Sequence, residues 1–213
     1  MKLFPFFYDI TEMRFLVIGG GEVAAGKISR LTSFTDQITV VAPKALIYIS
    51  KMAEEGRIRY EKRPFEDQDL DQYDCVISAT GNRELNRHVS ILCRKKGIPV
   101  NAVDDPENCT FFFPAILKRG HLTVAISTDG ASPSYAAMLK NEVDRNLPDH
   151  IEEILDIMLA ARKTLPSLYP DLGQKERARV YRKLLADLLS FQEIPKQEEV
   201  TDLVRKICQE EIE

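Results

Sequence analysis

The stretch Arg14-Phe-Leu-Val-Ile-Gly-Gly-Gly-Glu-Val-Ala-Ala-Gly-Lys27 decides the fold class of this chain. Four residues typical of a strand, Phe15 to Ile18, run directly into three glycines, and a helix-compatible segment follows. The spacing Gly19-x-Gly21-x-x-Ala24 is typical of a strand–turn–helix unit whose backbone lies against a pyrophosphate. Gly19 permits the tight turn, Gly21 lets phosphates approach the main chain, and Ala24 lets helix and strand pack closely. The motif therefore favours dinucleotide binding over a glycine turn with only a structural role.

The composition is that of an ordinary globular protein. The chain has 213 residues, of which 44% are hydrophobic and 29% charged, and its net charge of −4 argues against broad nucleic-acid binding. No apolar run approaches the roughly 18 residues of a membrane span, and the N-terminus lacks the cleavage site of a secretion signal. The four cysteines form no C-x-x-C pair and have no histidine at metal-ligand spacing. We therefore expect a cytoplasmic protein with reduced, mostly buried thiols and no preformed metal site.

Strand and helix signals alternate through the first half of the chain. The pattern predicts strands at residues 15–18, 38–42, 57–61, 75–79 and 98–103, and helices at 23–33, 46–55 and 84–96. Such alternation implies right-handed crossovers and a parallel sheet covered by helices on both faces. We therefore predict an α/β fold with a Rossmann-type parallel sheet, and a nucleotide at the carboxyl ends of its strands.

The pattern changes in the second half. Residues 111–117 and 122–127 predict a β-hairpin around a turn at 118–121, which could extend the sheet or pair with another subunit. The chain is helical from Asp149, where Asp149 and Glu152 predict a capping box. Three apolar stripes follow, and the prolines at 166, 170 and 195 are expected to separate the helices.

The second predicted strand ends without the acid that usually holds the ribose of NAD. It reads Val-Val-Ala-Pro43-Lys44, where an NAD-binding Rossmann unit normally has Asp or Glu. Either Pro43 and Lys44 contact the ribose through backbone and side-chain stem, or Lys44 favours a 2′-phosphate. A third reading leaves Lys44 solvated and the site weak, so the residues alone do not choose the coenzyme.

Polar residues follow two further predicted strands. Thr80 and Gly81 suit a loop that touches the nucleotide, although Gly81 could equally be a simple turn residue. Asn101 and Asp104 lie at the end of the last strand, where the reactive end of a bound cofactor points. Asp104 there could act as a general base or bind a metal ion. The structural alternative is that it closes a turn or acts as a capping residue before Pro106.

A polar loop precedes the helix expected at 134–145. Ser132 is a good N-cap with Pro133 at the first helical position, which is a sufficient structural explanation. The same helix start, with Thr128 and Gly130 in the loop before it, could also bind a substrate carboxylate.

Together these segments resemble the precorrin-2 dehydrogenase family, the NAD-dependent module of siroheme synthases, often also a sirohydrochlorin ferrochelatase. Members open with a short strand containing Pro and Asp, here Pro5 and Asp9. The motifs that carry the resemblance recur in order, and they are Gly19 to Lys27, Ile38 to Pro43, Ala79-Thr80, Val100 to Asp104 and Ser127 to Pro133. The resemblance covers about residues 1–148, and the helical tail fits the family only in general character.

The resemblance implies an NAD-binding Rossmann domain at 1–113, a dimerisation segment at 114–147, a helical domain at 148–213 and a homodimer. It implies oxidation of precorrin-2 to sirohydrochlorin, with NAD held by Gly19, Gly21, Glu22, Val23, Pro43, Lys44, Thr80 and Gly81. Asp104 matches the family's catalytic aspartate, which also meets Fe²⁺ transiently in members that are chelatases. The substrate-binding residues expected are Asn101, Thr128, Gly130 and Ser132.

The sequence departs from the family at two positions. Gly26 and Ala137 stand where members often have arginine, and Lys27, Lys118, Arg119 and Lys140 are the cations that could compensate toward a polycarboxylate substrate. One rival reading is an NAD-sensing regulatory module without turnover. A second is an S-adenosylmethionine methyltransferase, which also uses glycine turns but normally has an acid after the second strand.

Overall fold

The computed structural model describes residues 3–191 and 193–212, and the chain divides into two compact units between Phe113 and Pro114. Residues 1, 2, 192 and 213, which the predicted domain ranges include, lie outside the described residues.

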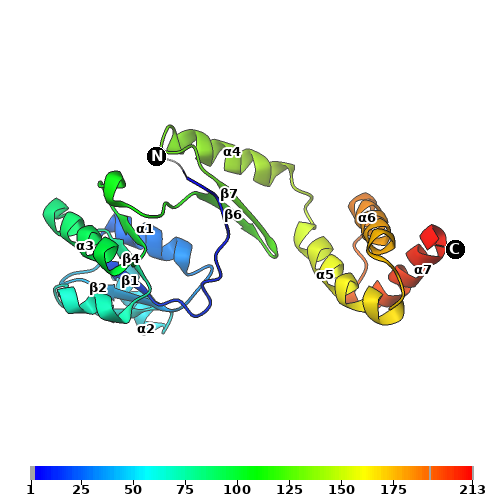
Figure 1. Ribbon diagram of the computed structural model, residues 1–213, viewed down its shortest axis with the longest axis horizontal. Helices are drawn as coiled ribbons and strands as arrows, with labels where there is room; N and C mark the ends of the chain where they lie inside the picture. The colour runs from blue at the N-terminus through cyan, green and yellow to red at the C-terminus, as the bar shows by residue number, and fades with distance from the viewer. Residues whose placement is uncertain (1–2, 192, 213) are drawn as a thin grey trace. The chain divides into compact units, whose positions relative to one another are not determined.

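The first unit is built on a five-stranded sheet, seen in Figure 1. Its strands are β1 (Phe15–Ile18), β2 (Ile38–Val41), β3 (Arg59–Glu61), β4 (Cys75–Ser78) and β5 (Val100–Ala102). They lie in the order β3-β2-β1-β4-β5, and every pair is parallel. This is the order of the first five strands of a Rossmann fold, with the switch point between β1 and β4, so the predicted fold class is confirmed.

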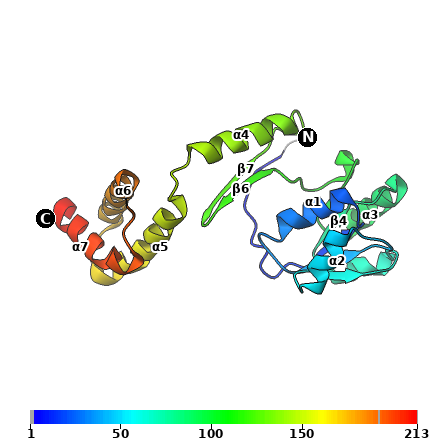
Figure 2. The ribbon, with the colours of Figure 1, turned by 180° about the vertical axis from the view of Figure 1, so that it is seen from behind.

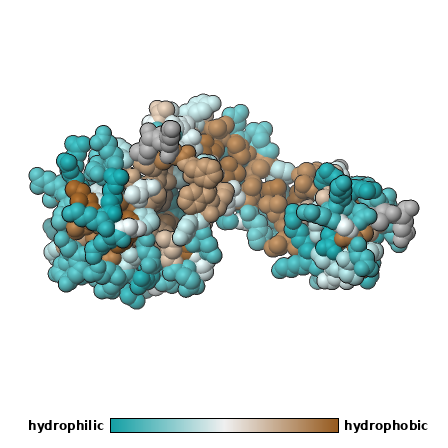
Figure 3. All heavy atoms as spheres, viewed as in Figure 1, coloured by the Kyte–Doolittle hydropathy of each residue, from teal (hydrophilic) through white to brown (hydrophobic). Residues whose placement is uncertain are grey.

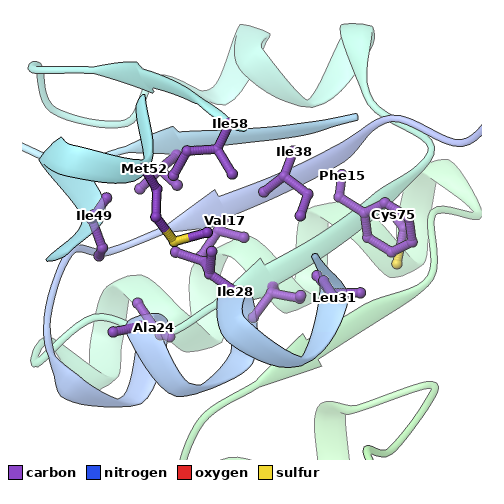
Figure 4. Close-up of a cluster of buried hydrophobic side chains, with 14 residues drawn as sticks. Phe15, Val17, Ala24, Ile28, Leu31, Ile38, Ile49, Met52, Ile58 and Cys75 are labelled. Carbon is purple, nitrogen blue, oxygen red and sulfur yellow. The ribbon is translucent and has the colours of Figure 1, made fainter. Parts of the chain in front are cut away.

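Helices cover both faces of this sheet because its strands are apolar on both sides. The helices are α1 (Glu22–Leu31), α2 (Ile47–Glu54) and α3 (Arg83–Lys96), with a 3₁₀ turn, η1 (Asp67–Gln72), after β3. On one face, Val17 of β1 packs with Ile28 of α1 and Met52 of α2, and Figure 4 shows these side chains pointing toward one another. On the other face, Leu16 packs with Val89 of α3. Figure 2 shows α1 and α2 from behind.

The second unit contains a hairpin, a long helix and a helical bundle. The hairpin strands β6 (Ala115–Arg119) and β7 (Leu122–Ile126) are antiparallel, and α4 (Pro133–Asn146) packs on them. The bundle is formed by α5 (Ile151–Leu168), α6 (Gln174–Ser190) and α7 (Val200–Ile212), and a short 3₁₀ turn, η3 (Gln197–Glu199), precedes α7. Another short 3₁₀ turn, η2 (Pro106–Asn108), follows β5 in the first unit. The bundle core contains the three predicted stripes, here represented by Ile154, Leu184 and Val204.

One predicted strand begins too early, and another is wrong. Residues 111–113 precede the hairpin and are not a strand, because Phe111 and Phe113 pack against the core beside α1 instead. The segment with Pro5 and Asp9 is also not a strand in the described residues 3–10. Asp9 there accepts bonds from the amide and hydroxyl of Thr11, at 3.0 and 2.6 Å, and so closes a turn.

Two predicted helix boundaries are also wrong. The N-cap of α5 is His150, without a side-chain capping bond, so Asp149 and Glu152 form no capping box. The Glu152 side chain lies instead against Gly120 in the hairpin turn. Pro166 lies inside α5 and does not end it, because the fully buried Leu165 holds the last turn in the bundle core. The prolines at 170 and 195 do separate helices, as predicted.

Candidate functional site

The three glycines after β1 have different surroundings. Gly19 has a φ of +116°, and a Cβ there would collide with the carbonyl of Ala79 at the end of β4. A Cβ on Gly20 would collide with the carbonyl of Lys44, and the Gly20 carbonyl accepts a bond from Leu46 at 2.9 Å. Gly21 has nothing within 4 Å of the place where a Cβ would stand. The first two glycines therefore pack the turn against neighbouring strand ends, and the third leaves space above the backbone.

This open space lies at the start of α1. Gly21 is the N-cap of α1 and provides no side-chain capping bond, and Glu22 and Val23 are exposed. The first amides of a helix have no partner within the helix, and they carry the positive end of its dipole. Ala24 is fully buried and packs α1 closely on the sheet, as predicted. A turn without side chains that opens a helix fits the pyrophosphate of a dinucleotide.

Pro43 and Lys44, which follow β2, are exposed. The Lys44 backbone lies against Gly20, so the loop after β2 is packed directly beside the glycine turn. Both residues thus lie just beyond the carboxyl end of β2, where the sequence predicted them.

Asn86 is a residue of the site that the sequence did not reveal. It is 2% exposed on α3, and its Oδ1 accepts bonds from the hydroxyls of Ser78 and Thr80 at 2.8 and 2.7 Å. Its Nδ2 donates to the carbonyls of Thr80 and Val103, at 3.0 and 3.4 Å. Asn86 thus joins the end of β4 to the end of β5. Gly81 lies exposed beyond this network.

A pocket of about 270 Å³ brings the start of α1 together with the end of β5. Its walls include Val23 and Lys27 from α1, and Asn101 and Asp104 from β5 and the turn after it. Asp104 is exposed and has a φ of +60°, in the left-handed region that residues with a side chain rarely adopt. A strained, exposed carboxylate in one pocket with residues of α1 is a candidate general base.

Lys27 is the cation among the described residues that line this pocket. Its Nζ lies 4.4 Å from the centre of the Phe113 ring, a cation–π contact. Burial lowers the pKa of Lys27, and the nearby charge of Arg30 lowers it further. A partly desolvated ammonium facing a pocket would gain from an anionic ligand.

Asn101 and Cys109 line the same pocket. Asn101 is 6% exposed, and its Nδ2 donates to the carbonyl of Phe111 at 3.0 Å. The Cys109 thiol is also buried, and it contacts the backbone of Ala102. The amide group of Asn101 therefore helps to fasten the chain after Asp104 to β5. All four cysteines are free and buried, as the sequence predicted.

The remaining predicted residues lie in the second unit, in the loop before α4. Thr128 Oγ1 accepts a bond from the Ser132 amide at 3.1 Å, and Ser132 Oγ caps α4 by accepting from the Tyr135 amide at 3.2 Å. Gly130 has a φ of +85°, which a turn at this place requires. These bonds give Thr128 and Ser132 structural roles within the loop.

The described residues, 3–191 and 193–212, contain no group of three or more His, Cys, Asp or Glu side chains placed to hold a metal ion. They also contain no helix long and apolar enough to cross a membrane.

The chain is similar to siroheme synthases. It is 36% identical over 177 residues to the siroheme synthase of Thioalkalivibrio sulfidiphilus (strain HL-EbGR7), covering 83% of this chain and 36% of that protein. It is 40% identical over 148 residues to the siroheme synthase of Methylobacillus flagellatus (strain ATCC 51484 / DSM 6875 / VKM B-1610 / KT), covering 70% of this chain and 32% of that protein. The chain thus spans about a third of the length of these curated relatives.

A solved structure described as "SirC, precorrin-2 dehydrogenase" has the same fold. Its TM-score is 0.77 with 24% sequence identity, and the match covers 96% of this chain and 100% of that one. Residues 119–146 match the family model "Sirohaem biosynthesis protein central". Residues 6–115, more than half of the chain, match the model "Putative NAD(P)-binding". The chain therefore belongs to the putative NAD(P)-binding family.

Proposed function

We propose that this chain oxidises precorrin-2 to sirohydrochlorin with NAD⁺. The single observation that carries the proposal is the pocket that unites Asp104 with the start of α1, where the glycine turn fits a dinucleotide. The similarity to siroheme synthases, and to a structure described as a precorrin-2 dehydrogenase, supports the tetrapyrrole as the substrate.

The reaction removes two hydrogens from the tetrapyrrole, one as a hydride and one as a proton. Bound NAD⁺ supplies the hydride acceptor. Gly21, Glu22 and Val23 hold the dinucleotide through backbone amides at the start of α1, and Gly19 shapes the turn before them, with its own amide bonded to the Val41 carbonyl. Thr80 and Gly81 border the dinucleotide after β4. Asp104 takes the proton, since its carboxylate is exposed at the pocket.

The tetrapyrrole carries carboxylate side chains, and Lys27 is proposed to meet one of them inside the pocket, where Asn101 also lies. The second unit, taken by itself, has a helix start at Thr128, Gly130 and Ser132 that suits a carboxylate.

NAD is the proposed coenzyme in preference to NADP. The Lys44 backbone packs against Gly20 beside the nucleotide turn, so this loop meets the ribose mainly through backbone and side-chain stem. The end of β2 lacks the carboxylate that usually takes the ribose hydroxyls of NAD, and Ala42 and Pro43 stand there as in the NAD-dependent family that the sequence resembles, so this resemblance supports NAD. Titration with NAD⁺ and NADP⁺ in separate calorimetric experiments tests this choice, and tighter binding of NADP⁺ would reverse it.

Insertion of Fe²⁺ into sirohydrochlorin is the second candidate activity. It requires a base for the pyrrole protons and a transient contact to the metal, and the exposed Asp104 carboxylate offers both. Iron is a substrate in this reaction.

We include a homodimer in the proposal because few side chains of the hairpin segment, residues 114–147, are buried. In residues 114–147 the buried side chains are Leu117 and Ala136, while Tyr135 and Met138 on α4 are 53% and 52% exposed. Figure 3 shows apolar residues, in brown, gathered over α4 and the hairpin. An apolar surface of this kind gains stability when a second copy covers it.

Anaerobic incubation with precorrin-2 and NAD⁺ tests the proposed function. We expect the tetrapyrrole spectrum to change to that of sirohydrochlorin while NADH forms in equal amount, with no change when NAD⁺ is omitted. Addition of Fe²⁺ afterwards tests the second activity by the spectrum of the iron product. Protein that binds NAD⁺ but forms no sirohydrochlorin would favour a regulatory NAD sensor instead. Binding of S-adenosylmethionine without NAD⁺ binding would favour a methyltransferase.

A further inference from the structure

The outer edge of β5 is covered by Cys109 and Thr110 instead of a strand. β5 is the last strand of the sheet and pairs with β4 on one side only. On its free side, the Val100 carbonyl accepts a bond from the Thr110 amide at 2.8 Å. The Val100 amide donates to Thr110 Oγ1, also at 2.8 Å. Thr110 therefore satisfies both backbone groups of one edge residue, as a paired strand would.

Cys109 has the same function for the next edge residue, Ala102. Its Sγ accepts a bond from the Ala102 amide at 3.2 Å, and the Ala102 carbonyl lies 3.2 Å from the same sulfur. The Asp105 carbonyl is 3.4 Å away. Burial raises the pKa of the Cys109 thiol, so it keeps its proton and can both accept and donate.

The turn between Ala102 and Cys109 contains Asp104. Ala102 ends β5, and Asp104 follows two residues later with its φ of +60°. A strained conformation of this kind persists only where the surroundings fix it. The bonds from Cys109 to Ala102 and to the Asp105 carbonyl fasten the backbone on both sides of Asp104.

We propose that Cys109 is the residue that positions Asp104, by clamping the end of β5 and the following turn so that the Asp104 carboxylate faces the pocket. This rests on the proposed function of Asp104 as the base. The thiol itself takes no part in proton or hydride transfer.

Turnover of precorrin-2 with NAD⁺ is to be compared in four proteins: wild type, Cys109→Val, Cys109→Ser and the control Thr110→Val. Valine keeps much of the volume of cysteine but forms no hydrogen bond, and Thr110→Val removes an equivalent edge bond further from Asp104. We expect Cys109→Val to lower kcat about tenfold with unchanged KM for both substrates, because small displacements of a catalytic group cost this much. Serine, which donates and accepts, restores most of kcat, and Thr110→Val loses thermal stability but keeps kcat. Equal kcat values in Cys109→Val and Thr110→Val would overturn the proposal.

A second readout does not depend on turnover. The backbone NMR chemical shifts of Asp104 report its φ, and we expect them to change in Cys109→Val but not in Thr110→Val. Unchanged Asp104 shifts in Cys109→Val would overturn the proposal. Wild-type protein that does not oxidise precorrin-2 would instead defeat the proposed function, and the shifts would still decide whether Cys109 fixes the turn. Cys109→Ala replaces Cys109→Val in both measurements if the valine variant does not fold.

Discussion

Single residues decide how the glycine turn works. The sequence predicted distinct roles for Gly19 and Gly21, and the structure agrees with a tight turn at Gly19. The close packing at Gly20 could not be predicted, because it depends on the loop after β2 crossing the turn, which is a tertiary contact.

Gly19→Ala is expected to lower the stability of the protein, and Gly21→Ala is expected to weaken NAD⁺ binding. A Cβ at Gly19 meets the Ala79 carbonyl at an unfavourable φ, so Gly19→Ala should lower the free energy of unfolding by at least about 2 kcal/mol. Gly21→Ala adds a methyl group to open space, so the cost in stability should stay within about 1 kcal/mol, which is the disadvantage of alanine at an N-cap. The same methyl group would occupy the place proposed for the pyrophosphate, so NAD⁺ binding should weaken at least about tenfold.

Urea denaturation and calorimetric titration with NAD⁺ measure these two effects. Wild-type affinity for NAD⁺ in Gly21→Ala would show that the pyrophosphate does not lie over this turn.

Lys27→Met is expected to raise the KM for precorrin-2 about tenfold, because the pocket loses the ammonium that would pair with a substrate carboxylate. Lys27→Arg should keep most of the affinity, and NAD⁺ binding should be unchanged in both variants. Arg30→Met, on an exposed part of the same helix, removes the same charge and serves as the control. Equal KM values in Lys27→Met and Arg30→Met would contradict the role of Lys27.

At the scale of elements, the sequence predicted the sheet better than its surroundings. β1 was predicted with its observed bounds, since a short apolar run before glycines has few alternatives. The hairpin begins later than predicted because the aromatic residues before it, Phe111 and Phe113, pack against the core of the first unit. Asn86 was missed because a polar residue inside a helical pattern normally faces solvent. Only the fold places it between the ends of β4 and β5.

The element η1 is expected to make the first unit sensitive to acid. The buried Asp69 carboxylate accepts bonds from Arg63 at 2.7 and 2.8 Å, and the Arg63 bond lowers the pKa of Asp69 below its usual value. A group with a lowered pKa in the folded state stabilises the fold above the unfolded-state pKa. This stabilisation is lost as the pH falls below about 4 and through the folded-state pKa.

Asp69→Asn should therefore lower the free energy of unfolding by about 2 kcal/mol at neutral pH. The variant should also lose less stability than wild type when the pH is lowered. Urea denaturation at a series of pH values measures both effects. Asp67→Asn is the control, because its pair with His88 is exposed and contributes little. An unchanged acid profile in Asp69→Asn would contradict this assignment.

At the scale of the whole molecule, the buried apolar residues form two separate groups, one around the sheet and one inside the helical bundle. The sheet core and the bundle core were both visible as sequence patterns, because alternation and helical periodicity differ along the chain. The sequence could not show how few side chains of residues 114–147 are buried, because exposure depends on what packs against each side chain.

The exposed apolar side chains of α4 are expected to hold a dimer together. Tyr135→Glu combined with Met138→Glu should convert the protein to a monomer in light scattering, because both charges would be buried between the copies. Tyr48→Glu, at an exposed position on α2, serves as the control and should leave the mass unchanged. A wild-type protein that is monomeric at all concentrations tested would contradict the dimer.

The central claim is that Asp104 takes a proton while NAD⁺ takes a hydride. It is tested most directly by the kcat of Asp104→Asn with precorrin-2 and NAD⁺, because asparagine keeps the size of the side chain and the tolerance for a positive φ. We predict a kcat at least about a hundredfold below wild type, with unchanged affinity for NAD⁺ in a calorimetric titration. A variant that oxidises precorrin-2 at the wild-type rate would contradict the account.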